Sequence, residues 1–345
     1  MTQKKMTIKD IAKLAGVSKG TVDRVLHKRG KVSKEALEKV EKILKEIEYQ
    51  PNPIARNLKE NKVYRISILI PDYEIDIFWK PAHDGIKEAE KEFGPFGVLV
   101  EKFIYNPFQK EDFHQKSIEA ISVFPNLLLI TPLFEKESFL ISKTCKKKNI
   151  KVALFNNHIK SKNAESYVGQ DLMQSGKIAA DLIYKTSKLN CDIGIVHINL
   201  EPHLLLKEQG FKNYFSEKNS NIRVLESTNF KTNDPTKFVN DITIYLKAHP
   251  KLGALFITNS HVHEVAEIVS KINKDCAIIG YDLIPKNVTY LKKGKINFLI
   301  HQRPKEQAYL SISYYAEYFL FGKKVPLSNL LPIDIITSEN VDYYL

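Results

Sequence analysis

Polar and aromatic side chains follow several short apolar runs in the sequence, and their types would suit the binding of a sugar. Asp and Asn side chains can exchange hydrogen bonds with neighbouring hydroxyls, and flat rings can stack on the apolar face of a pyranose. The candidate residues are Asp76, Phe78, Trp79, Asn156, Asn259, Asp282 and Gln302. Together they favour a small neutral polyol as ligand. Any one of them could instead be a strand-end group that caps a helix.

The elements that must position these residues are alternating strands and helices. From Arg65 onward, apolar runs (ISILI, VLVEKF, LLLIT, KVALF, IGIVHI, VLEST, ALFIT and AIIGY) alternate with stretches of helical spacing, the first four near 81–93, 109–122, 135–148 and 174–186. This alternation predicts an α/β fold with doubly wound parallel sheets, and the length favours two sheets. Ligands bind beyond the carboxyl ends of such strands, which is where the candidates lie.

The positive charge of the chain is concentrated at its start. Residues 1–63 hold 16 Lys and Arg against 8 Asp and Glu, a net charge of +8 out of the total of +12. A small basic head on a nearly neutral body predicts that the head meets a polyanion.

The head has the capping and turn residues of three short helices. Thr7 and Asp10 have capping-box spacing, Ser18 can cap a second helix to about Leu26, and Ser33 can cap a third. Gly16 permits the turn between the first two helices. The pattern predicts a helix-turn-helix closed by a third helix.

If the second helix lies in a DNA major groove, its polar side chains are the candidate contacts. These are Ser18, Lys19, Thr21, Arg24 and His27. Gly20 has no side chain at a position where a side chain could contact a DNA base. Asp23 could accept from a cytosine amino group, or could pair with Lys19 along the helix.

Residues 7–59 resemble the LacI/GalR family of bacterial repressors nearly without gaps, through TIKDIAKLAGVSKGTVDRVLH and KVSKEALEKVEKILKEIEYQPNPIARNLK. The resemblance implies a hinge helix in which Asn52 and Ala55 take the family's positions and Leu58 wedges into the minor groove. A wedge of this kind unstacks bases in exchange for bent DNA. Leu58 could alternatively pack on the body as part of a linker.

The body is similar to the type I periplasmic-binding-protein fold that this family uses as an effector domain, through VGQDLMQSGKIAADLI, QGFKNYF, FITNS, IIGYD and HQRP. The resemblance singles out Asp282 and Gln302 as effector contacts, and then Asp76, Phe78, Trp79, Asn156 and Asn259. Two positions depart from the family pattern. Leu205 stands where many sugar-binding relatives carry an arginine, and Asn156–Asn157 replace a common Asp-Arg pair.

The expected organisation is an all-α three-helix head followed by an α/β body of two doubly wound subdomains around a cleft. Residues 1–49 would form the DNA-binding domain, 50–63 the hinge helix and linker, and 64–345 the effector-binding and dimerisation domain. The N-subdomain would take about 64–188 and 300–324, and the C-subdomain about 189–299 and 325–345.

Several function classes lack their signatures. No GxGxxG follows a strand, no phosphate loop or GxSxG elbow occurs, and no cofactor is expected. His261 and His263 point apart at i, i+2, and Cys145, Cys191 and Cys276 lack metal-site spacing, so no metal is expected either. The start lacks a signal peptide and no run could span a bilayer, which predicts a cytoplasmic protein with no membrane partner.

The leading hypothesis is a transcriptional regulator, most simply a repressor, whose affinity for operator DNA is set by a small carbohydrate in the cleft. A palindromic operator needs two heads, so a homodimer is expected. The alternatives are a sugar-active α/β enzyme, or a sensor of a purine-like ligand, fused to the same head. A solute-binding protein for a transporter fits poorly, because the signal peptide is missing and the head is basic.

Overall fold

The computed structural model describes residues 6–27, 29–47, 49, 62–159, 163–186, 191–218, 222–272 and 275–345. The chain divides into two compact units, Met1–Asn61 and Lys62–Leu345. The predicted hinge residues Asn52, Ala55 and Leu58 lie outside the described residues.

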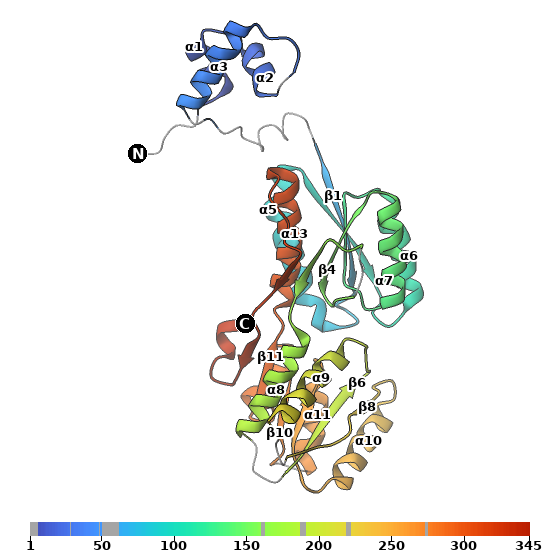
Figure 1. The fold of residues 1–345 in the computed structure, drawn as a ribbon. Coiled ribbons are helices and arrows are strands. Elements are labelled where there is room, and N and C mark those ends of the chain that lie inside the picture. Colours follow the sequence, from blue (N-terminus) through green and yellow to red (C-terminus); the bar gives the residue numbers. More distant parts are fainter. Residues whose placement is uncertain are drawn as a thin grey trace. The chain divides into compact units, whose positions relative to one another are not determined.

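The head contains the three helices that its caps predict (Figure 1), α1 (Ile8–Ala15), α2 (Lys19–Leu26) and α3 (Lys34–Glu46). The capping box of Thr7 and Asp10 is present, and the hydroxyls of Ser18 and Ser33 accept from backbone N–H groups of the next helix. Gly16 ends α1 at φ 65°, a left-handed conformation that suits glycine. The small core is built from the buried side chains Ile11, Ala12, Ala15, Val22 and Val40.

The second unit, which we call the body, is built on two sheets. The first has the order β12-β5-β4-β3-β1-β2, with all its pairs parallel. Its strands are β1 (Tyr64–Pro71), β2 (Val98–Tyr105), β3 (Leu127–Ile130), β4 (Lys151–Asn156), β5 (Ser166–Gly169) and β12 (Ser328–Leu330). One face is covered by α5 (Lys80–Phe93) and α13 (Pro304–Phe321), the other by α6 (Lys110–Ser122) and α7 (Glu135–Lys147). Short 3-10 turns lie at Ile77–Trp79 and Gly94–Phe96.

The second sheet has the order β13-β11-β10-β9-β6-β7, and β8 also pairs with β6. Its strands are β6 (Asp192–Ile198), β7 (Arg223–Val224), β8 (Thr228–Phe230), β9 (Leu252–Ile257), β10 (Ala277–Tyr281), β11 (Phe298–His301) and β13 (Asp334–Ile336). One face packs on α8 (Leu172–Thr186) and α9 (Leu204–Glu217), the other on α10 (Pro235–Ala248), α11 (Val262–Ile272) and α12 (Pro285–Lys292). A 3-10 turn, Val341–Tyr344, ends the chain.

The predicted α/β body is confirmed, with two differences in detail. The β11–β13 pair is antiparallel, so the second sheet is not purely parallel. The run VLEST was predicted to be one strand, but it is divided between β7 and β8 with no helix following β7. Such a short apolar run cannot specify where pairing with β6 begins and ends.

The chain passes between the two sheets three times, and we call these passages the crossovers. They lie at Gln170–Asp171, Gln302–Arg303 and Leu331–Ile333. The first lobe is then 62–169 with 304–330, and the second lobe is 172–301 with 334–345.

The subdomain boundaries predicted near residues 188 and 325 were therefore wrong. Helix α8 packs in the core of the second lobe, and β12 pairs with β5 in the first lobe. The glycines of α8 and α9 explain why α8 belongs there. A Cβ at Gly176 would stand 1.9 Å from the Lys207 carbonyl oxygen, and one at Gly210 would stand 1.9 Å from the Met173 carbonyl oxygen. The two helices thus touch backbone to backbone.

Bilayer-spanning helices are missing from the described residues, since none combines the necessary length with sufficient apolar character.

Candidate functional site

The predicted DNA-contacting side chains lie on or next to α2. Lys19 and Arg24 are exposed, whereas Thr21 and His27 are half-buried. The Ser18 hydroxyl caps the helix, accepting from the N–H of Thr21 at 3.1 Å. Arg24 is oriented by a 3.1 Å hydrogen bond from its Nε to the Gly20 carbonyl oxygen.

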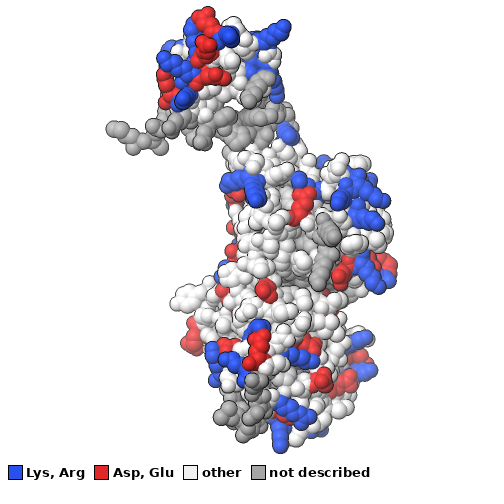
Figure 2. Space-filling view, viewed as in Figure 1, with Lys and Arg blue, Asp and Glu red and all other residues white. Residues whose placement is uncertain are grey.

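The charges around these residues are mixed. Figure 2 shows basic and acidic side chains interspersed over the visible face of the head. The Asp23 carboxylate lies 3.8 Å from Nε2 of His27, one helical turn away. His27 is thus positioned in part by its own helix. The role of each of these residues at DNA stays a prediction.

Gly20 has room for a side chain, which makes its purpose testable. A Cβ there would meet only the end of the Arg24 side chain at 3.7 Å and the Ser18 hydroxyl at 3.8 Å, both ordinary contacts. Gly20→Ala should therefore leave the head at least as stable, by up to about 1 kcal/mol, because alanine loses less backbone entropy in a helix. We expect it to weaken operator binding, because the added methyl would keep α2 away from the DNA backbone. Thermal melting and operator titration of the same variant would check this, and unchanged operator affinity would remove Gly20 from the interface.

Asp282 and Gln302 meet at the carboxyl ends of β10 and β11, as their positions in the sequence suggested. Both are buried, and Nε2 of Gln302 donates to both carboxylate oxygens of Asp282 at 3.0 Å. Asp282 has a φ of 71°, which turns the chain sharply after β10. Burial raises the pKa of the Asp282 carboxyl, against the opposing effects of Lys207 and Gln302.

Lys207, on α9, is the buried cation beside this pair. Its side chain is almost inaccessible, and its Nζ lies 3.5 Å from the ring centroid of Tyr281 and donates to the Thr258 carbonyl oxygen at 3.1 Å. Burial lowers the pKa of Lys207, while the nearby charges of Asp282 and Glu201 act to raise it. A buried cation of this kind can hold acceptor oxygens of a ligand.

The sequence pattern does not indicate that Lys207 is buried, because in the segment LLLKEQGF two of the leucines are exposed and the charged residues are buried. Leu205 and Leu206 are 48% and 40% exposed, whereas Lys207 and Glu208 are 1% and 8% exposed. The signal that could have found it is its position. Lys207 lies one helical turn before Gly210, where the close contact with α8 fixes the buried face of α9.

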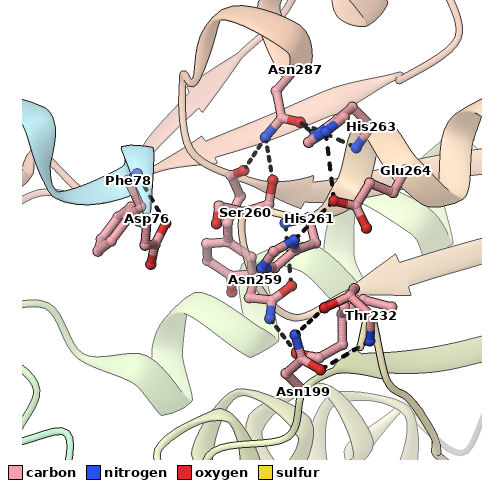
Figure 3. A network of polar contacts seen from close by, with 12 residues as sticks. Asp76, Phe78, Asn199, Thr232, Asn259, Ser260, His261, His263, Glu264 and Asn287 are labelled. Carbon is pink, nitrogen blue, oxygen red and sulfur yellow. Dashed lines mark hydrogen bonds and ion pairs between the residues drawn. The ribbon is translucent and has the colours of Figure 1, made fainter. Parts of the chain in front are cut away.

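Acidic and basic groups from both lobes face one another close to Asp282 and Lys207. Figure 3 shows Asp76 and Phe78, at the 3-10 turn Ile77–Trp79 of the first lobe, opposite Ser260, His261 and Asn259 of the second. Burial and, to a smaller extent, the Asp76 charge raise the pKa of Glu201 to about 7, against the opposing charges of Lys207 and His261. Burial also raises the pKa of Asp76. Burial acts to lower the pKa of His261, but Glu264, Asp76 and Glu201 together hold it above its usual value.

These facing groups are nevertheless accessible to solvent. The Glu201 side chain is 39% exposed and that of His261 is 28% exposed. Desolvation together with accessibility is expected of the walls of a concave site, where protein surrounds a group without covering it. We call the facing groups and the Asp282, Gln302 and Lys207 cluster the inter-lobe site.

The loops of the second lobe that carry the site are held by amide side chains (Figure 3). The Nδ2 of Asn287, which is fully buried, donates to the carbonyl oxygens of Ser260, Tyr281 and Asp282 at 2.8–3.0 Å. Asn259 donates to the Ile198 carbonyl oxygen at 2.7 Å and accepts from the N–H of His261. The predicted ligand residue Asn259 thus also joins the ends of β6 and β9.

Three predicted ligand residues belong mainly to the first lobe's own interior. Phe78 and Trp79 are 9% and 2% exposed and lie in its hydrophobic core, with their rings edge to face. Trp79 therefore offers no open ring face for stacking in this structure. Asn156 is buried and donates from Nδ2 to Oε1 of Gln307 at 3.2 Å.

The raised pKa of Glu201 predicts a dependence of stability on pH. Between about pH 4.5 and pH 7 the folded protein holds a proton that the unfolded chain releases, so the free energy of unfolding should fall as the pH rises through this window. Melting temperatures from about pH 5 to pH 8 would measure this fall. Glu201→Gln should flatten it, whereas Glu226→Gln, at a fully exposed side chain of the same lobe, should not. An unchanged slope in Glu201→Gln would place the titration elsewhere.

The structure also assembles a Thr-His-Glu array within the second lobe. Nδ1 of His197 lies 2.8 Å from the Thr258 hydroxyl and its Nε2 lies 2.7 Å from Glu208. Thr258 and His197 are 0% and 2% exposed and lie in the interior of the second lobe. Asp171, in the first crossover, accepts from the N–H of Gln174 at the start of α8. No group of three or more potential metal ligands occurs among the described residues.

Family models match both parts of the chain. Residues 66–324 match the periplasmic binding protein domain, and residues 7–52 match the model described as bacterial regulatory proteins, lacI family. A solved structure assigned as a LacI transcriptional regulator from Bacteroides fragilis superposes with a TM-score of 0.76 at 26% identity, covering 82% of this chain and 100% of that chain. GanP, a glucose-galactose binding protein from Geobacillus stearothermophilus, shares the fold, with a TM-score of 0.71 at 23% identity over 81% of this chain and 99% of that chain.

Relatives by sequence match either most of the chain or about a fifth of it. The ribose operon repressor of Halalkalibacterium halodurans is 29% identical over 81% of both chains. The sucrose operon repressor of Klebsiella pneumoniae is 47% identical over 75 residues, 21% of this chain and 22% of that protein. A helix-turn-helix head on a two-lobed binding-protein body defines a DNA-binding transcriptional regulator. The chain belongs to the lacI family of bacterial regulatory proteins.

Proposed function

We propose that the protein is a repressor whose affinity for operator DNA is controlled by a small carbohydrate bound in the inter-lobe site. The observation that carries the proposal is the cluster of Asp282, Gln302 and Lys207, which lies where strands from the second lobe meet a crossover. Its carboxylate, amide and ammonium groups offer both acceptors and donors to hydroxyls. Relatives named as ribose and sucrose operon repressors support a sugar.

The head would act in pairs. Each α2 would read one half-site through Lys19, Thr21, Arg24 and His27, so the protein would bind a palindromic operator as a homodimer in the cytoplasm. Residues 50–63 would form the hinge, with Asn52, Ala55 and Leu58 in their family positions and Leu58 as the minor-groove wedge. An effector with different affinities for two lobe arrangements would shift the paired hinges, and one with equal affinities would not.

Thermal stabilisation tests the ligand half of the proposal. The full chain would be melted with monosaccharides, disaccharides, sugar phosphates and purine bases, since a ligand that binds only the folded state raises the melting temperature. A saturable shift with one sugar class, lost in Asp282→Ala, is the expected result. A shift with a purine base instead would favour the purine-sensor alternative. No shift with any compound would contradict a carbohydrate effector.

A further inference from the structure

A chain of buried side chains links the inter-lobe site to the first lobe through the second crossover. Nε2 of Gln302 donates to Asp282, Nε2 of Gln307 donates to the Gln302 carbonyl oxygen at 2.6 Å, and Oε1 of Gln307 accepts from Nδ2 of Asn156 at 3.2 Å. All four side chains are at most 9% exposed. The chain runs from β10 of the second lobe to the end of β4 in the first.

The direction of these hydrogen bonds is fixed by the groups at each link. The Gln302 carbonyl oxygen can only accept, so the Gln307 amide must present its nitrogen to it and its oxygen to Asn156. An ionised Asp282 can likewise only accept, so it takes the nitrogen of Gln302. Each amide therefore has one favourable orientation. A change at Asp282 alters the group that holds the Gln302 side chain, and Gln302 is part of the second crossover.

The crossovers are tied to one another around this chain. Nε2 of Gln170, in the first crossover, donates to the carbonyl oxygens of His301 at 3.1 Å and Pro332 at 2.6 Å. Arg303 has a φ of 55°, unusual for a long side chain, and its guanidinium binds both carboxylate oxygens of Asp334. Strained backbone of this kind persists where surrounding contacts hold it. The three passages are thus hydrogen-bonded to one another. Gln307 joins the second of them to Asn156 at the end of β4, and Tyr167 joins the first of them to the same residue.

We propose that Gln307 is a positioning residue that transmits the state of the Asp282–Gln302 pair to β4, so that effector occupancy changes the arrangement of the two lobes. The inference rests on the proposed function, because it takes Asp282 and Gln302 as effector contacts. Gln307 itself need not touch the effector.

Two variants separate the links. Gln307→Met keeps the side-chain length and removes both hydrogen bonds. In its ionised form, Gln307→Glu can still accept from Asn156 but cannot donate to the Gln302 carbonyl oxygen, so it breaks the link to the crossover. Thr131→Val is a matched control, since the fully buried Thr131 binds Tyr105 and the Leu69 carbonyl oxygen inside the first lobe.

The first measurement compares ligand binding with its transmission in the full chain. The probe is the panel sugar that most stabilises the parent, and the DNA is a duplex selected from random sequence by the parent. Both Gln307 variants should reduce the ratio of operator affinities without and with sugar by about fivefold or more, within the usual range of coupling between sites, while sugar affinity changes much less. If both Gln307 variants keep the parent's ratio of operator affinities, the proposal is overturned. Thr131→Val is the folding control and should keep the parent's ratio.

The second measurement needs neither effector nor operator. Spin labels at Ser122→Cys in the first lobe and Ser216→Cys in the second, with Cys145, Cys191 and Cys276 replaced, report the distance between the lobes. Gln307→Met and Gln307→Glu should broaden or shift the distance distribution of the ligand-free protein, and Thr131→Val should not. A distribution identical to the parent's would refute the positioning role even if the effector proved not to be a sugar.

Discussion

Asp282→Asn is expected to lower effector affinity by about ten- to a hundredfold, because a hydrogen bond to a buried charged group contributes roughly 1.5–3 kcal/mol. Asparagine keeps the shape of the side chain but removes the charge that acts on Lys207. Its amide nitrogen cannot accept a hydrogen bond from Nε2 of Gln302, which donates to both carboxylate oxygens of Asp282. Calorimetric titration of the parent's best panel sugar measures the loss.

The matched control is Asp171→Asn. Asp171 is exposed and binds the first turn of α8, so this variant should bind the sugar like the parent. Operator affinity without sugar should stay within a fewfold of the parent's in both variants. Normal sugar affinity in Asp282→Asn would move the ligand away from the Asp282–Gln302 pair.

Arg24→Ala is expected to weaken binding to the selected operator by about ten- to a hundredfold, since a well-placed contact to a base edge contributes roughly 1–3 kcal/mol of discrimination. Arg24 is exposed and held toward the start of α2 by its bond to the Gly20 carbonyl oxygen, so its loss should leave the head folded. Binding to random duplex should fall less, because phosphate contacts from other residues remain.

Comparison with lysine variants distinguishes base reading from phosphate contact. Lys19→Ala should weaken binding to operator and random DNA alike and reduce the slope of log affinity against log salt by about 1. Lys39→Ala, at an exposed side chain of α3 that pairs with Glu35 at 2.6 Å, should change neither. An Arg24→Ala protein with parental operator affinity would take Arg24 out of the recognition surface.

The head illustrates what could be predicted from local sequence. Capping and turn formation depend on residues three or four positions apart, so Thr7 with Asp10, Ser18, Ser33 and Gly16 located the three helices directly. The alternation of apolar runs and amphipathic stretches likewise predicted both sheets. The rule that ligands bind beyond the carboxyl ends of parallel strands drew attention to the ends of β10 and β11, and the resemblance to the family singled out Asp282 and Gln302 there.

The sequence by itself therefore determined the class of protein, the helices of the head and the pair at the centre of the site. Only the tertiary structure decided that α8 belongs to the second lobe, that Lys207 is buried and that Trp79 lies in a core. The physical reason is that these outcomes depend on contacts between distant segments. The burial of Lys207 relies on Gly176 of α8, Thr258 after β9 and Tyr281 of β10, and no local pattern places these groups around one side chain.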